Sequence, residues 1–212
     1  MSFAARLAEV RARIAAACER SGRQPTEITL VAVSKTMPPE ACREAVAAGQ
    51  LILGENYAQE LRDKARLVEG ARWHYLGPLQ RNKVKYVVGV AELIHSVDSV
   101  EILNEIAARA RKMNVIQRCL IQVNVGDEPQ KSGCSVADLP ALKAAFSEGV
   151  ELEGLMCIPP ADDDPVPHFR KLRTLRGNLP HLSMGMSGDY EAAIAEGATL
   201  IRVGSALFGA RS

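Results

Sequence analysis

The chain has 212 residues, enough for one large globular domain with a full hydrophobic core. Its 26 Lys plus Arg nearly balance 25 Asp plus Glu, and 47% of its residues are apolar. The resulting net charge of +1 gives no global field that would attract nucleic acid or anionic lipid, so we expect neither as a partner. The five cysteines are odd in number and include no CxxC pair, which predicts reduced thiols and no metal site.

The first twenty residues predict an amphipathic helix. Phe3, Leu7, Val10 and Ile14 recur at helical spacing with charged residues between them. The segment lacks the apolar core of a signal peptide, and no later run reaches the roughly 18 apolar residues of a membrane span. We therefore expect a cytoplasmic protein that does not bind membranes.

Apolar runs rich in β-branched residues alternate with Ala-, Glu- and Arg-rich helical stretches along the rest of the chain, as in a parallel sheet with helical crossovers. Eight strand candidates begin near Ile28, Leu51, Arg72, Glu92, Gln117, Val150, His181 and Leu200. Helical patterns such as Glu40–Ala48 and Val100–Lys112 separate most of them. We predict an α/β fold: a single closed (β/α)8 TIM-type barrel over residues 1–212 with an extra N-terminal helix. An open doubly wound sheet is the alternative.

Lys35 follows the apolar run Ile28–Ser34 and precedes the break at Pro38–Pro39, so it is expected at the carboxyl end of a buried strand. Barrel enzymes carry their chemistry at these strand ends. A deprotonated lysine amine there could form a Schiff base with an aldehyde. The ordinary alternative is an ammonium that reaches water along the strand end.

The ends of the seventh and eighth strands predict an anion site, because the loops after these strands often bind phosphate in this fold. Ser187 precedes Gly188–Asp189 and the helical stretch Tyr190–Ala195, so Ser187 or Asp189 is expected to cap that helix. Gly204 removes a side chain where a ligand would approach, and Ser205 adds a hydroxyl and an N–H. The alternatives are that Ser187 is a plain helix N-cap and that Gly204 marks a tight corner of the barrel.

Arg202 interrupts the apolar strand Leu200–Val203, where an unpaired charge would be costly. Its partner could be a ligand passing over Gly204 or a carboxylate such as Glu55. An amine, an anion cradle and an arginine together fit a phosphorylated aldehyde cofactor such as pyridoxal 5′-phosphate (PLP).

In this arrangement the PLP aldehyde would join Lys35 and the phosphate would meet Ser187, Gly204 and Ser205. The ring nitrogen would face Arg202, and Asn56 could bond the ring hydroxyl. Residues on other strands carry less information about function. We interpret His95, Ser96 and Asp98 as polar residues at the end of a strand, and Trp73 and Tyr75 as part of the barrel wall.

At these residues the chain resembles the pyridoxal phosphate homeostasis protein family, also called YggS or PROSC proteins. Seven blocks in order carry the resemblance: Val31–Lys35, Gly54–Tyr57 with Gln59–Glu60, Trp73–Gly77 with Leu79–Gln80 and Asn82–Lys83, Lys131–Gly133, Gly154–Met156, Leu182–Ser187 with Asp189, and Arg202–Ala206 with Phe208–Gly209. Pro78, Cys157 and Ala58 depart from residues common in the family.

The resemblance implies a fold similar to the N-terminal domain of alanine racemase and PLP held as an internal aldimine on Lys35. The remaining cofactor-binding residues are expected to be Asn56, Met184, Ser187, Arg202, Gly204 and Ser205. Lys83 and Lys85 could form a second, weaker PLP site, although exposed helix charges are the simpler interpretation.

The resemblance also implies a carrier or buffer in intracellular PLP homeostasis, without catalytic residues and with transient contacts to apo PLP enzymes. An arginine at the ring nitrogen weakens the cofactor as an electron sink, which argues in the same direction. We expect a monomer. A PLP-dependent amino-acid racemase and a cofactor-free Schiff-base aldolase remain the alternatives.

Overall fold

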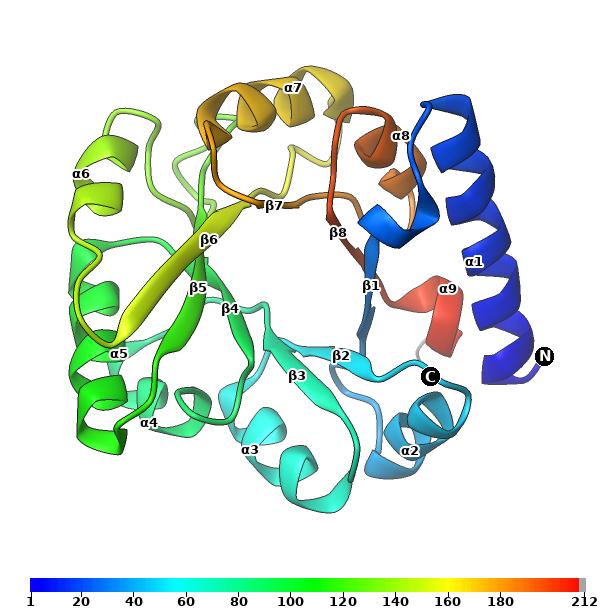
Figure 1. Ribbon diagram of the computed structural model, residues 1–212, viewed down its shortest axis with the longest axis horizontal. Helices are drawn as coiled ribbons and strands as arrows, with labels where there is room; N and C mark the ends of the chain where they lie inside the picture. The colour runs from blue at the N-terminus through cyan, green and yellow to red at the C-terminus, as the bar shows by residue number, and fades with distance from the viewer. Residues whose placement is uncertain (210–212) are drawn as a thin grey trace.

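The computed structural model describes residues 1–209 and confirms the predicted barrel (Figure 1). Each strand pairs in parallel with the next, and the last pairs with the first to close the sheet. The eight strands are β1 Thr29–Val33, β2 Ile52–Glu55, β3 Arg72–Tyr75, β4 Leu93–Val97, β5 Gln117–Gln122, β6 Val150–Met156, β7 His181–Ser183 and β8 Leu200–Val203. Every predicted strand start coincides with the observed one or precedes it by one residue.

The helices form a ring around the strands (Figure 1). They are α1 Phe3–Arg20, α2 Pro39–Ala47, α3 Ala58–Leu67, α4 Val84–Val87, α5 Val100–Met113, α6 Leu139–Ala144, α7 Pro165–Arg176, α8 Tyr190–Ala195 and α9 Ser205–Phe208, with short 3-10 turns at Pro25–Glu27 and Arg81–Lys83. None of the helices within residues 1–209 combines the length and apolarity of a membrane span. The five cysteines are buried free thiols.

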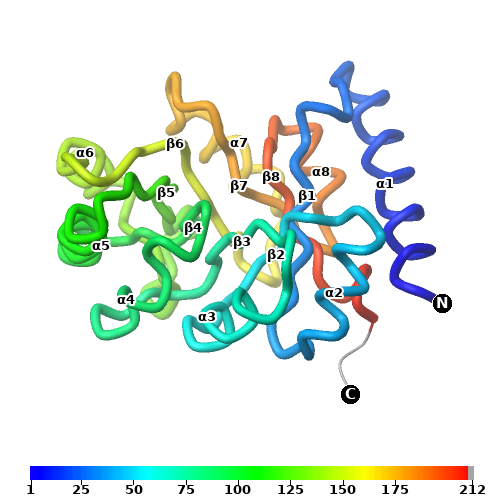
Figure 2. The backbone as a smooth tube through the Cα atoms, turned by 60° about the horizontal axis from the view of Figure 1, so that its bottom comes forward, coloured from blue at the N-terminus to red at the C-terminus, as the bar shows by residue number. Residues whose placement is uncertain are grey.

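The extra N-terminal helix α1 lies on the outside of the barrel, packed against α8 and α9 (Figures 1 and 2). Its predicted apolar face is buried: Phe3, Leu7, Val10 and Ile14 belong to the main hydrophobic core. Because a helix of this kind is stabilised mainly by burying its apolar stripe, α1 is an integral layer of the fold.

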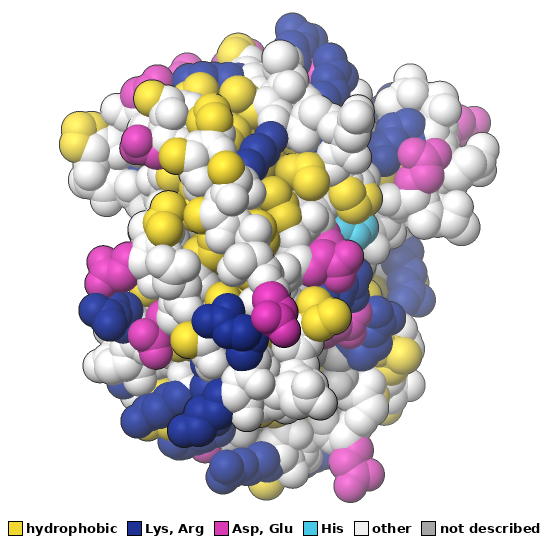
Figure 3. Space-filling model, turned by 60° about the vertical axis from the view of Figure 1, so that its left-hand side comes forward, with side chains coloured by type: hydrophobic (Ala, Val, Ile, Leu, Met, Phe, Trp, Pro, Cys, Tyr) yellow, Lys and Arg dark blue, Asp and Glu magenta, His cyan; other side chains and the backbone are white. Residues whose placement is uncertain are grey.

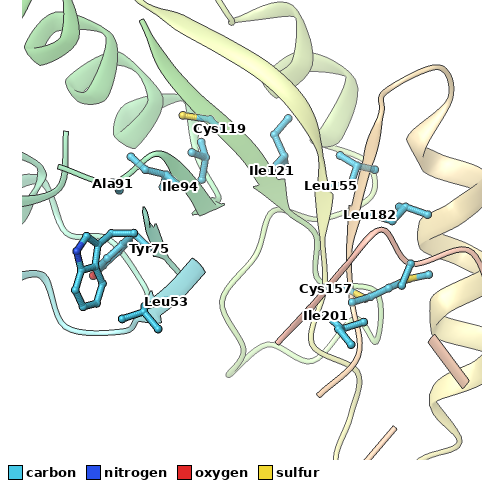
Figure 4. Packing of buried hydrophobic residues seen from close by; sticks show 14 of the residues in the cluster. Leu53, Tyr75, Ala91, Ile94, Cys119, Ile121, Leu155, Cys157, Leu182 and Ile201 are labelled. Carbon is cyan, nitrogen blue, oxygen red and sulfur yellow. The ribbon is translucent and has the colours of Figure 1, made fainter. Parts of the chain in front are cut away.

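Most of the core lies between the strands and the surrounding helices (Figure 4). Leu53, Tyr75 and Ile121 point outward from their strands into this layer, and Trp73 is buried with them, which confirms the barrel-wall prediction for the two aromatic residues. Successive residues of a strand face opposite sides of the sheet, so the alternate positions point into the barrel.

A separate apolar cluster fills part of the barrel interior. It contains Val31, Leu76, Leu93, Leu120, Met156 and Leu200. Two residues beyond Leu93 and Leu200 on their strands stand His95 and Arg202, both buried. The interior therefore changes from apolar to polar toward the carboxyl ends of these strands.

Gly154 is a test of how tightly β6 and β7 pack. An added Cβ would lie 2.2 Å from the carbonyl oxygen of His181, a backbone atom that cannot rotate away. We expect Gly154→Ala to lower the free energy of unfolding by about 2–3 kcal/mol in urea titrations. Gly188→Ala is the matched control, because a Cβ there meets no atom within 4 Å. Equal stability of the two variants would contradict the packing argument.

Candidate functional site

A pocket of about 300 Å³ opens at the carboxyl ends of the strands. Its lining consists of Val33, Lys35, Asn56, Leu76, Ile158, Met186, Ser187, Gly188, Arg202, Gly204 and Ser205. The structure thus brings six of the seven sequence-derived site residues together. Met184 is the exception: it is fully buried in the main core and does not line the pocket, whereas Met186 does.

Lys35 lies two residues beyond the end of β1, in a turn where its side chain is half-buried. Its amine makes no hydrogen bond or ion pair with another residue of the described range 1–209 and lines the pocket. The next residue, Thr36, has a φ of 65°. A β-branched residue in this left-handed conformation is strained, so other contacts must hold the turn.

Those contacts come from a buried cluster of charges on β2 and α3. The Lys64 ammonium donates to the Ser34 carbonyl oxygen at 2.9 Å, to Glu55 Oε1 at 2.7 Å and to Glu60 Oε2 at 2.8 Å. The Ser34 hydroxyl donates to the same Glu55 oxygen at 2.7 Å. The residue before Lys35 is therefore fixed by both ends of a buried ion pair.

The residue after Lys35 is held by the same cluster, because the Thr36 N–H donates to Glu60 Oε2 at 3.0 Å. Burial alone would lower the pKa of Lys64, but its hydrogen bonds and ion pairs with Glu55 and Glu60 together outweigh burial and raise it, so Lys64 remains an ammonium. Sequence reasoning missed Lys64. Its signal was faint: a lysine on the buried face of a helix, beside Leu61 and four residues after Glu60.

Arg202 is 4% exposed and reaches the pocket from inside the barrel. Its Nη1 donates to Ser183 Oγ at 2.6 Å and its Nη2 to the Cys157 carbonyl oxygen at 2.9 Å. The suggested ion pair with Glu55 is wrong, because Glu55 pairs with Lys64. Burial lowers the pKa of Arg202. No carboxylate of residues 1–209 neutralises the guanidinium, which leaves a positive charge available to a ligand.

The loops after β7 and β8 meet through one hydrogen bond, from the Gly204 N–H to Ser187 Oγ at 3.3 Å. Ser205 follows as the first residue of α9. The predicted side-chain cap of α8 is wrong. Asp189 occupies the N-cap position, but its carboxylate accepts from the Met186 N–H at 2.6 Å instead of from the helix. Backbone and hydroxyl groups therefore converge here without a carboxylate among the lining residues.

Asn56 lines the pocket beside Lys35, and its Oδ1 is buried without a hydrogen-bond partner among residues 1–209. Gly77 makes room for it: a Cβ at position 77 would lie 2.1 Å from the Asn56 carbonyl oxygen. A buried oxygen without a partner is costly, which favours a ligand that donates a hydrogen bond. The amine, guanidinium, hydroxyls and free acceptor fit a phosphorylated aromatic aldehyde such as PLP.

His95 lies inside the barrel, fully buried, so its assignment to strand-end polarity is wrong. Its Nδ1 lies 2.8 Å from Ser183 Oγ and its Nε2 lies 2.9 Å from Nδ1 of His74. Burial lowers the pKa of His74 to about 4 and that of His95 well below its usual value of 6.5. Both imidazoles are therefore neutral at physiological pH.

Lys83 and Lys85 do not line this pocket, although Lys83 lines a neighbouring pocket that shares Asn56 with it. Their ammonium groups are 5.9 and 5.1 Å from the ring centroid of Tyr86, and the Arg62 guanidinium is 4.9 Å from it. On the face drawn in Figure 3, Lys and Arg side chains gather in the lower part, among apolar and a few acidic groups. A second PLP site at the two lysines stays a prediction.

Lys64 provides a test of the buried charge cluster. Lys64→Met leaves the fully buried Glu55 carboxylate without its cation, so we expect a loss of about 3–5 kcal/mol in the free energy of unfolding. Adding Glu55→Gln should recover part of this loss, because no unpaired charge then remains. The exposed Lys85→Met serves as control, with an expected change within about 0.5 kcal/mol in urea titrations. A Lys64→Met loss no larger than that of the control would count against the cluster.

The buried histidine pair predicts lower stability in acid. His74 faces Glu92, Arg72, Arg118 and His181, and His95 faces Arg202, yet burial dominates and the native pKa values lie below 6.5. The unfolded chain therefore binds more protons below pH 6.5, and each histidine should lower the free energy of unfolding by up to about 1.4 kcal/mol per pH unit. Urea titrations at about pH 7, 6 and 5 measure this slope. The change of the free energy of unfolding with pH should be smaller in His74→Gln. A wild-type free energy of unfolding that does not change between pH 7 and 5 would contradict the prediction.

Comparisons with known proteins agree with the resemblance seen in the sequence. The family model described as alanine racemase, N-terminal domain, matches residues 6–212. A pyridoxal phosphate homeostasis protein of Aquifex aeolicus is 45% identical, with 100% of this chain and 99% of that protein covered. The protein of the same name from Escherichia coli K12 is 44% identical, over 97% of this chain and 95% of that protein.

Solved structures show the same barrel. PipY of Synechococcus elongatus, in a structure with PLP bound, is 35% identical with a TM-score of 0.82, covering 98% of this chain and 100% of that one. Alanine racemase of Corynebacterium glutamicum is 14% identical with a TM-score of 0.66, covering 95% of this chain and 61% of that one, a likeness of fold alone. Near-complete coverage at this identity means that the chain belongs to the pyridoxal phosphate homeostasis protein family, built on the alanine racemase N-terminal domain.

Proposed function

We propose that this protein binds PLP, holds it covalently through Lys35, and acts as a carrier or buffer in PLP homeostasis without strong catalytic activity. The observation that carries the proposal is the placement of the Lys35 amine. It lines a pocket shared with Arg202, Ser187, Gly204 and Ser205, between two neighbours that Lys64 and Glu60 anchor.

PLP, when bound, supplies an electrophilic carbonyl carbon, an anionic phosphate and a pyridine nitrogen. In our assignment the Lys35 nitrogen would replace the carbonyl oxygen, which leaves as water, and the hydroxyls of Ser187 and Ser205 with the Gly204 backbone would receive the phosphate. Arg202 donates to the ring nitrogen, and Asn56 Oδ1 accepts from the ring hydroxyl. Each role uses a group that lines the pocket.

The composition of the pocket supports binding over catalysis. Among the described residues that line it, Lys35 and Arg202 are the charged groups, and Tyr, His, Cys, Asp and Glu are absent. A racemase needs an acid and a base on opposite faces of the cofactor ring. With Lys35 as the one reactive amine among the lining residues of 1–209, this composition favours holding an aldehyde over exchanging protons.

A reduction experiment tests the covalent assignment. Protein purified with PLP should be yellow, and borohydride should fix a cofactor adduct that mass spectrometry places on the Lys35 peptide. Lys35→Ala should abolish the adduct, because no other lysine lines the pocket within residues 1–209. The exposed Lys85→Ala should retain it. An adduct on another lysine in the wild type would overturn the assignment.

Two assays separate the carrier from the alternative functions. The carrier should deliver bound PLP to an apo-enzyme, and exchange of the α-hydrogen of amino acids in deuterated water should stay at the Lys35→Ala background. Rapid exchange that depends on Lys35 would make the protein a racemase-type enzyme. An adduct with a phosphorylated sugar in the absence of PLP would make it a cofactor-free aldolase.

A further inference from the structure

Four side chains form a continuous hydrogen-bonded chain across the barrel interior. Arg202 on β8 contacts Ser183 on β7 at 2.6 Å, Ser183 contacts His95 on β4 at 2.8 Å, and His95 contacts His74 on β3 at 2.9 Å. All four residues are at most 4% exposed. Burying so many polar groups is unfavourable unless every hydrogen bond is made, so the chain calls for a role beyond packing.

The hydrogen positions along this chain follow from donor chemistry. A guanidinium is only a donor, so Ser183 Oγ accepts from Arg202. Ser183 Oγ could also accept from His95, but its own buried hydrogen would then have no acceptor among residues 1–209. The direction that satisfies this hydrogen has the Ser183 hydroxyl donating to Nδ1 of His95. That nitrogen is consequently unprotonated.

The direction continues through the two imidazoles. Because the pair is neutral, His95 carries its hydrogen on Nε2 and donates to Nδ1 of His74. His74 then carries its own hydrogen on Nε2. Each histidine is thereby restricted to one tautomer, and every hydrogen in the chain points from β8 toward β3.

We infer that His74, His95 and Ser183 are positioning residues for Arg202: their one-way hydrogen-bond chain turns the Ser183 hydroxyl hydrogen toward His95, so that an Oγ lone pair faces Arg202 and fixes the guanidinium at the pocket. The Cys157 carbonyl oxygen fixes the second amino group at 2.9 Å. Arg202 can then offer only N–H donors in one orientation, which selects a ligand with an acceptor atom at that place. We identify this acceptor as the unprotonated ring nitrogen of PLP, an identification that rests on the proposed function.

The tautomers can be measured without any cofactor. Long-range ¹H–¹⁵N correlation spectra of cofactor-free protein labelled with ¹⁵N-histidine report which ring nitrogen carries hydrogen. The protein has four histidines. The variants His168→Gln and His181→Gln identify the signals of the two histidines outside the His74–His95 pair. We expect His74 and His95 to be neutral with hydrogen on Nε2. Hydrogen on Nδ1 of His95, or rapid averaging of its two tautomers, would overturn the inference.

A matched pair of variants tests the effect on Arg202. An Asn amide oxygen lies near the place of Nδ1 in histidine, so His95→Asn can still accept from Ser183. A Gln side chain reaches the Nε2 place instead, so His95→Gln keeps a polar contact with His74 but leaves Ser183 without its acceptor. Ser183→Ala removes the hydroxyl itself, and Ser183→Thr restores one.

We expect Ser183→Ala and His95→Gln to raise the dissociation constant for PLP about tenfold, the equivalent of one hydrogen bond to a charged group. The absorption band of the bound cofactor should shift in these two variants. His95→Asn and Ser183→Thr should stay within about threefold and keep the wild-type band, as one weak hydrogen bond would allow. Unfolding titrations confirm that the compared proteins are folded.

The outcomes separate the inference from the proposed function. Equal effects of His95→Asn and His95→Gln, or an unchanged Ser183→Ala, would refute the positioning role even if PLP binds. Failure of the wild type to bind PLP would refute the proposed function. The tautomer spectra would still show whether the hydrogen bonds from Arg202 to His74 run in the inferred direction.

Discussion

The geometry of the pocket depends on a buried ammonium that never enters it. Lys64 comes from α3, outside the barrel, and binds the backbone of Ser34 together with Glu55 and Glu60. These bonds hold both neighbours of Lys35 and keep Thr36 in a strained conformation. A single buried charge therefore converts a flexible turn after β1 into a fixed platform for one reactive amine.

Two kinds of buried cation serve different ends in this barrel. Lys64 is neutralised by carboxylates and acts on the backbone, whereas Arg202 has neutral partners and keeps its charge for the pocket. The contrast explains how a protein of nearly zero net charge can attract a phosphorylated ligand. The attraction is local, in a site where water is partly excluded and a full charge acts over a short distance.

The sequence was sufficient for the fold because the signals for the barrel are local. Apolar runs, helical periodicity and Pro–Pro breaks each occupy a few consecutive residues, and the eight strands follow from them. Lys35 and Arg202 were identifiable for a related reason. A polar residue at the end or in the middle of an apolar strand is conspicuous without any knowledge of its neighbours.

The parts that escaped prediction depend on contacts between distant segments. Lys64 reads like any helix lysine until α3 is packed on the barrel, and the chain from His74 to Arg202 crosses four strands. Met184 was expected in the pocket from the family resemblance. It faces the core, as Leu182 two residues earlier does. Gly185, whose φ of 91° turns the chain, separates it from Met186, which lines the pocket.

Gly77 shows that a residue can shape the cofactor pocket through an atom it lacks. Its Cα lies so close to the Asn56 carbonyl that any side chain would push the Asn56 segment away from its place beside Lys35. The constraint at this position is empty volume, because an added Cβ would lie 2.1 Å from the Asn56 carbonyl oxygen. Mutational surveys that rank residues by the chemistry of their side chains will overlook such a site, although its replacement would alter the pocket as surely as the loss of a hydrogen-bonding group.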